Sequence, residues 1–153
     1  MKRNALLLLL FIGGTGLLSS ADNQGLTFYV QLIRGTNGET PPAPEARRAG
    51  PQLTQRLRVF KWKNYWEMNR RTVVLKPGAR SRQRLTPGRD VEIALTSPQD
   101  MTVSIYTDGQ LTRRRKQAAD TAFYIAGGDR DDAQCWFIVV RRDNPQEAQV
   151  SVK

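Results

Sequence analysis

The sequence contains no histidine and only one cysteine, Cys135. Without histidine, mechanisms that need an imidazole base and zinc sites with histidine ligands are excluded. A single cysteine cannot form an intrachain disulfide, and its place in the apolar run 135–140 predicts a buried, inert thiol. Carboxylate pairs are the main remaining candidates for catalysis, and their spacing does not indicate that any two meet in a cleft. We therefore predict no catalytic residue, no metal site and no cofactor.

The only long apolar run is confined to the N-terminus. Two basic residues precede the run 5–12, which is too short to span a bilayer, and small residues follow at 19–21. This pattern is typical of a cleaved secretory signal peptide, with an uncleaved anchor as the alternative. We expect residues 1–21 to be the signal peptide and residues 22–153 to be one periplasmic or secreted domain without a membrane span.

The rest of the chain lacks helical periodicity and shows apolar residues at every second position, separated by turn residues. A stretch rich in glycine and proline, residues 35–52, predicts a long exposed loop. Asp108-Gly109 predicts a type I′ hairpin, and Pro-Gly turns recur at 77–78 and 87–88. The predicted strands cover residues 26–34, 53–68, 72–75, 79–85, 89–95, 101–107, 110–116, 121–126 and 134–141.

Eight or nine short strands in one domain predict an all-β fold. An immunoglobulin-like β-sandwich is the first expectation, and a small β-barrel is the second. Residues 135–140 are apolar on both strand faces, so we expect the strand 134–141 to lie inside a sheet.

Positive charge is concentrated in one segment of the sequence. The formal net charge is +10, and residues 47–89 contain thirteen basic residues and one acidic residue, which gives this segment +12. Residues 22–46 and 90–153 each sum to −2. A contiguous basic block of this kind predicts a surface that attracts anions.

Two groups of cations in the sequence suit strand edges. Arg80, Arg82 and Arg84 alternate with polar residues, which places the three guanidinium groups on one strand face about 7 Å apart. Such a row can bind phosphates, sulfates or carboxylates, or it can simply keep an edge strand solvated. The run 113–116 is basic at every position and predicts an exposed edge. If the strands 79–85 and 89–95 pair through a three-residue loop, residues 87–89, Arg84 lies opposite Glu92; the alternative is that the two strands lie in different sheets.

Residues 60–71 interleave aromatic side chains with cations. One interpretation is a core strand with a basic outer face. The other is a ligand site in which Tyr65 offers a stacking surface flanked by cations. The candidate site residues in this segment are Lys61, Lys63, Tyr65, Arg70 and Arg71.

These observations predict an exported, non-catalytic binding or accessory module. Its basic surface would bind an acidic partner protein or an anionic polysaccharide or lipid headgroup, and nucleic acid is the less favoured ligand for an exported protein. The alternatives are a structural subunit that pairs strands in an envelope assembly and a small carboxylate-dependent hydrolase.

Overall fold

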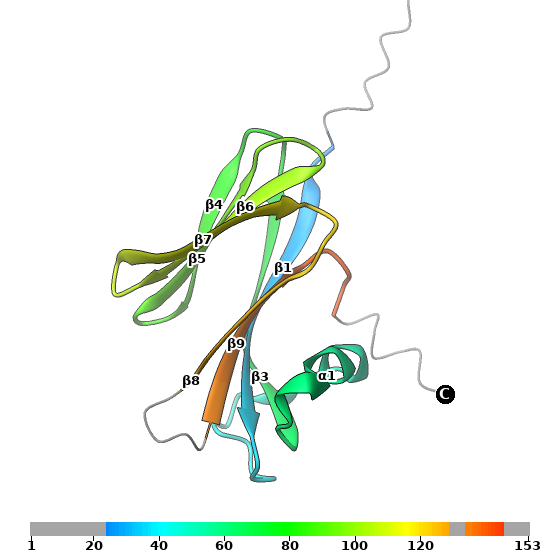
Figure 1. The fold of residues 1–153 in the computed structure, drawn as a ribbon, viewed down its shortest axis with the longest axis vertical. Helices are drawn as coiled ribbons and strands as arrows, with labels where there is room; N and C mark the ends of the chain where they lie inside the picture. The colour runs from blue at the N-terminus through cyan, green and yellow to red at the C-terminus, as the bar shows by residue number, and fades with distance from the viewer. Residues whose placement is uncertain (1–23, 129–133, 146–153) are drawn as a thin grey trace, which may run out of the picture.

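The computed structural model describes residues 24–128 and 134–145, so the expected signal peptide and its cleavage position lie outside the described residues. The elements follow one another along the chain in Figure 1. They are β1 (Leu26–Thr36), β2 (Arg47–Arg48), α1 (Pro51–Leu57), the 3₁₀ turn η2 (Arg58–Phe60), β3 (Asn64–Leu75), β4 (Arg80–Thr86), β5 (Arg89–Leu95), β6 (Asp100–Thr107), β7 (Gln110–Ala118), β8 (Phe123–Gly128) and β9 (Gln134–Arg141).

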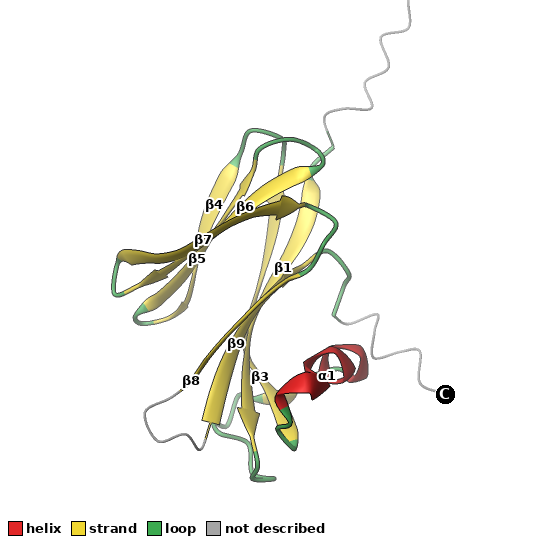
Figure 2. Cartoon of the chain, viewed as in Figure 1, coloured by secondary structure: helices red, strands yellow, loops and turns green. Residues whose placement is uncertain are grey.

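The strands form two antiparallel sheets. The five-stranded sheet has the order β2-β3-β1-β9-β8, and the four-stranded sheet has the order β4-β5-β6-β7 (Figure 2). The predicted all-β sandwich is confirmed. Four consecutive strands form the second sheet as a meander, whereas immunoglobulin sandwiches distribute their strands between the sheets by Greek-key connections. The likeness to immunoglobulins therefore concerns the architecture and not the strand order.

Turn residues form the connections that their sequence predicts. Gly78 has a φ of 86°, and the Ala79 amide donates to the Lys76 carbonyl at 2.9 Å, as in a type II turn with glycine at its third position. Asp108 and Gly109 have φ angles of 50° and 81° between β6 and β7. Positive φ at both central residues is the signature of the predicted type I′ hairpin.

The main core lies between the two sheets. Phe28, Val30 and Leu32 of β1 contribute from the centre of the five-stranded sheet, and the facing sheet contributes alternate residues of β5 and β6. The buried members of this core are Phe28, Val30, Leu32, Val73, Leu75, Leu85, Val91, Ile93, Leu95, Met101, Val103, Ile105, Ala119, Phe123, Ile138 and Val140.

A helix occupies part of the segment predicted as the strand 53–68, so that prediction is wrong for residues 53–63, whereas residues 64–68 are the start of β3. Pro51 stands at the first turn of α1, where its missing N–H costs nothing, and Leu53 and Leu57 lie one turn apart on the same helix face. Both leucines are buried against Phe137 on the outer side of the five-stranded sheet. The expected loop 35–52 is also shorter, because it contains the end of β1, all of β2 and the start of α1.

The strand that contains the only cysteine lies inside its sheet, as predicted. β9 pairs with β1 on one side and with β8 on the other. Cys135 is half-buried and not fully buried, because it stands near the end of β9, where its thiol donates to the Gly127 carbonyl at 3.0 Å. The prediction that this thiol is buried is therefore wrong.

Candidate functional site: the basic edges of the four-stranded sheet

The predicted arginine row lies on β4, at one edge of the four-stranded sheet. Arg80, Arg82 and Arg84 are all exposed, and the residues between them are half-buried. The predicted register of β4 against β5 is wrong, because the prediction assumed a regular pairing without a bulge. β4 and β5 are joined by the two-residue loop 87–88, and an irregularity between Arg84 and Thr86 shifts the pairing by one residue. Arg84 consequently lies opposite Asp90 and not opposite Glu92.

Asp90 partly neutralises this row. Arg82 Nη2 lies 2.9 Å from Asp90 Oδ2, and Arg84 Nε lies 3.1 Å from Asp90 Oδ1. Arg82 also stacks on Tyr106, with 3.7 Å between its Cζ atom and the ring centroid. Hydrogen bonds from Arg84 and Arg82 hold the pKa of the Asp90 carboxyl below its ordinary value, against the opposing effect of burial. Arg80 is the member of the row without an ion-pair partner among the described residues.

The lowered pKa of Asp90 predicts an acid-sensitive contribution to stability. A carboxyl whose folded pKa lies below its unfolded pKa stabilises the fold above the unfolded value, about 4, and loses this effect as the pH falls through the folded value. We expect Arg82→Gln/Arg84→Gln to lower the free energy of unfolding by about 1 kcal/mol or less at pH 7. Urea unfolding should show that the stability difference between the native chain and the variant decreases as the pH falls from 5 to 2. An unchanged stability difference at pH 2 would contradict this role for Asp90.

The second basic edge is β7, where four consecutive cations are exposed. Arg113 and Arg115 occupy the strand face that carries the core, and Arg114 and Lys116 occupy the opposite face. Arg114 Nε donates to Ser104 Oγ at 3.2 Å. Within the described ranges, none of the four cations has a carboxylate partner. β7 therefore presents more uncompensated positive charge than β4, and the prediction of an exposed edge here is confirmed.

A groove separates β7 from β8 along one open side of the sandwich. Two depressions of about 280 and 250 Å³ lie between these strands and share Arg113 and Ile125. The strands diverge from their connecting loop in Figure 1, and each is the last strand of its sheet. The groove combines cations with an apolar floor, and its lining includes Ile105, Arg113, Arg114, Arg115, Phe123, Tyr124, Ile125, Gly127 and Trp136.

Lys61 and Lys63 are exposed in the segment before β3, which belongs to a different sheet from the β4 row, so the structure does not join the two predicted groups into one site. Tyr65 is only 4% exposed, and its hydroxyl donates to the Leu57 carbonyl at 2.6 Å. Its ring packs edge-on against Phe137. Burial under α1 removes the stacking surface that the sequence suggested for Tyr65, and this expectation is corrected.

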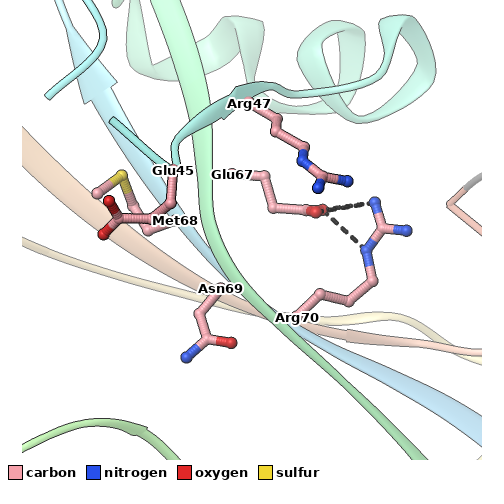
Figure 3. Close-up of a pocket in the computed structure, with 6 residues that line it drawn as sticks. All are labelled: Glu45, Arg47, Glu67, Met68, Asn69 and Arg70. Carbon is pink, nitrogen blue, oxygen red and sulfur yellow. Dashed lines mark hydrogen bonds and ion pairs between the residues drawn. The ribbon is translucent and has the colours of Figure 1, made fainter. Parts of the chain in front are cut away.

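Arg70 lines a shallow hollow of about 290 Å³ beside β2 (Figure 3). β3 contains a bulge, at which one of its residues has no partner in the pairing with β1. The bulge places Glu67 and Arg70 on the same face of the sheet and allows their ion pair at 2.8 Å. The carboxylates of Glu45 and Glu67 point away from each other in Figure 3, which is not the arrangement of a glycosidase pair. Arg71 is exposed, and its Nε reaches the Arg84 carbonyl at 3.5 Å.

Glu67 is also one end of a buried polar network. Gln31, 1% exposed, donates its amide to Glu67 and accepts a hydrogen bond from Arg141 Nε at 2.9 Å. Arg141 is 2% exposed, and its Nη1 lies 2.7 Å from Asp143 Oδ2. Burial lowers the pKa of Arg141, opposed by the nearby Asp143 charge. The sequence pattern did not predict this network, because its members are far apart along the chain.

A row of alternating arginine and tryptophan crosses the five-stranded sheet and was also missed. Cross-strand pairing places Arg48 beside Trp66, Trp66 beside Arg34, Arg34 beside Trp136 and Trp136 beside Gly127. The Arg48 Cζ atom lies 4.6 Å from the ring centroid of Trp66. The row therefore adds side-chain contacts between neighbouring strands of this sheet.

Arg89 extends this row from the facing sheet. Its Cζ atom lies 3.8 Å from the ring centroid of Trp136, so the guanidinium stacks on the indole. Trp136 also lines the groove between β7 and β8. The stack therefore fixes one wall of the groove.

The described residues contain no group of three or more cysteine, aspartate or glutamate side chains that could hold a metal ion. None of the helices in this part of the chain is long and apolar enough to cross a membrane. Comparison of the whole chain with protein-family models, curated proteins and solved structures finds no match.

Proposed function

We propose that this chain is an exported, non-catalytic binding module that holds an anionic partner on its basic surface. The partner is an acidic protein or an anionic envelope polymer, such as a polysaccharide or a lipid headgroup layer. The observation that carries the proposal is the exposed cation row of β7, which lies beside an apolar groove and has no carboxylate partner among the described residues.

The two basic edges support the proposal unequally. On β4, one carboxylate already compensates part of the charge of Arg82 and Arg84, so an incoming anion would have to compete with Asp90. On β7, an anion meets no such competitor within the described chain. We therefore place the principal anion contact on β7 and a secondary contact at Arg80.

A second candidate function is a strand-pairing subunit of an envelope assembly. It is supported by β8, an edge strand without charged residues or proline. Such edges are templates for pairing with another strand. In that case the cations would only keep the protein soluble and steer its electrostatic encounter with other subunits.

Salt dependence of polyanion binding tests the proposal. We expect the mature chain to bind heparin with an affinity that falls steeply with salt, because bound cations displace counterions. Arg113→Gln/Arg115→Gln/Lys116→Gln should reduce the log–log slope by about two to three units, at roughly 0.7 to 0.9 per lost contact.

The β4 row supplies a matched control, Arg80→Gln/Arg82→Gln/Arg84→Gln, with the same change in charge. It should reduce the slope by about one unit, because Asp90 compensates part of its charge. Equal slopes for the native chain and the β7 variant would contradict the proposed surface. Circular dichroism should show that both variants remain folded, because all six side chains are exposed.

A further inference from the structure

Sheet edges differ in how they are protected from pairing. β2 has two residues, both arginine, and β4 and β7 carry rows of cations. β8 has the sequence Phe-Tyr-Ile-Ala-Gly-Gly and carries neither charge nor proline. Natural proteins usually protect an edge by charges, proline or short length, so β8 is the edge strand without such protection among the described residues.

The side chains around this edge form two facing rows. Phe123 and Ile125 of β8 point toward the core side of their sheet, and both line the groove. Across the groove, Arg113 and Arg115 occupy the core-side face of β7 and are exposed. A strand added to β8 would therefore have one side facing the two arginines.

From this geometry we propose that β8 binds an extended segment of an acidic partner protein by strand addition, with carboxylates at alternate positions facing Arg113 and Arg115. The inference rests on the proposed function and names the class of its partner. The two arginines are two residues apart on a strand, so they are separated by about 7 Å, which equals the spacing of alternate side chains on the added strand. Main-chain hydrogen bonds would supply affinity, and the arginines would select for acidic residues.

The charge distribution favours a peptide over a flexible polymer at this position. An anionic polymer needs only the cations, which are exposed on both faces of β7. A peptide strand uses in addition the uncharged backbone edge of β8 and the apolar groove floor at Ile125. The core-facing pair of arginines points to the side of β7 on which an added strand would lie.

The test uses a capped nine-residue peptide in which glutamate alternates with threonine. The control peptide has the same side chains with N-methyl groups on alternate backbone amides, which removes the donors needed for strand pairing. We expect the first peptide to bind and to slow hydrogen exchange at amides of residues 123–128. The N-methylated peptide should bind at least about tenfold more weakly, because it loses the backbone hydrogen bonds to β8.

Two double variants of the same strand separate position from charge. Arg113→Gln/Arg115→Gln should weaken peptide binding about tenfold, whereas Arg114→Gln/Lys116→Gln, with the same charge change on the opposite face, should weaken it by about twofold or less. Equal effects of the two variants, or binding without slower exchange at β8, would overturn strand addition.

The heparin experiment separates the two proposals. A protein that binds heparin through β7 but not the peptide retains the proposed function and loses this inference. A protein that binds neither contradicts both. Peptide binding with protection of β8 and a selective effect of the core-facing arginines supports both.

Discussion

Replacing Arg141 by methionine should lower the free energy of unfolding by about 3 kcal/mol, although the methionine fills much of the same volume. The guanidinium is buried between Gln31 and Asp143, and its loss leaves the Gln31 carbonyl oxygen buried without a donor. An unsatisfied buried acceptor costs much more than the net value of an ordinary hydrogen bond. Urea denaturation of the protein measures the change.

The neighbouring Arg142 provides the control, because it is an arginine on the same segment with an exposed side chain. Arg142→Met should change the unfolding free energy by about 0.5 kcal/mol or less. The double variant Gln31→Met/Arg141→Met should cost less than the sum of the single variants, with a coupling of about 1 kcal/mol or more. Equal stability of Arg141→Met and Arg142→Met would show that the buried network does not stabilise the fold.

The fold class was predictable because period-two patterns depend on local sequence. Alternating apolar residues located β5 and β6, and the Asp108-Gly109 hairpin marked the boundary between β6 and β7. Helix α1 was missed because seven residues give only two buried positions, Leu53 and Leu57, which also suit the predicted strand. Pro51 at the first helical turn was the local signal that could have located it.

The candidate site was less predictable, because register and bulges decide which charges meet. The alternation of Arg80, Arg82 and Arg84 correctly predicted a common exposed face. Their compensation by Asp90 depends on an irregularity beside Leu85, which a simple two- or three-residue loop does not include. A second bulge, in β3, similarly brings Glu67 and Arg70 onto one face.

The groove between β7 and β8 could not be derived from sequence at all. Its cations come from the four-stranded sheet and most of its apolar residues from the five-stranded sheet, so their distance depends on how the two sheets diverge. The sequence did identify the run 113–116 as an exposed edge, but it gave no reason to prefer Arg113 and Arg115 over their neighbours. That preference follows from the register of β7 against β6.

Gly127→Ala should destabilise the fold by about 1–3 kcal/mol, although the change adds only one methyl group. A Cβ atom at this position would overlap the indole ring of Trp136, which lies on the paired residue of β9. The ring would have to move, which would disturb its stack with Arg89, whose Cζ atom lies 3.8 Å from the ring centroid. We expect a lower thermal midpoint and an altered near-ultraviolet dichroism signal from the displaced tryptophan.

Gly128→Ala is the matched control on the same strand, because a Cβ atom there meets nothing within 4 Å. It should change stability by about 0.5 kcal/mol or less and leave the tryptophan signal unchanged. Because Gly127 and Trp136 both line the groove, Gly127→Ala should also weaken binding of the acidic peptide, whereas Gly128→Ala should not. Identical stability and spectra for the two variants would mean that the Trp136 ring shifts freely and does not form a fixed wall of the groove.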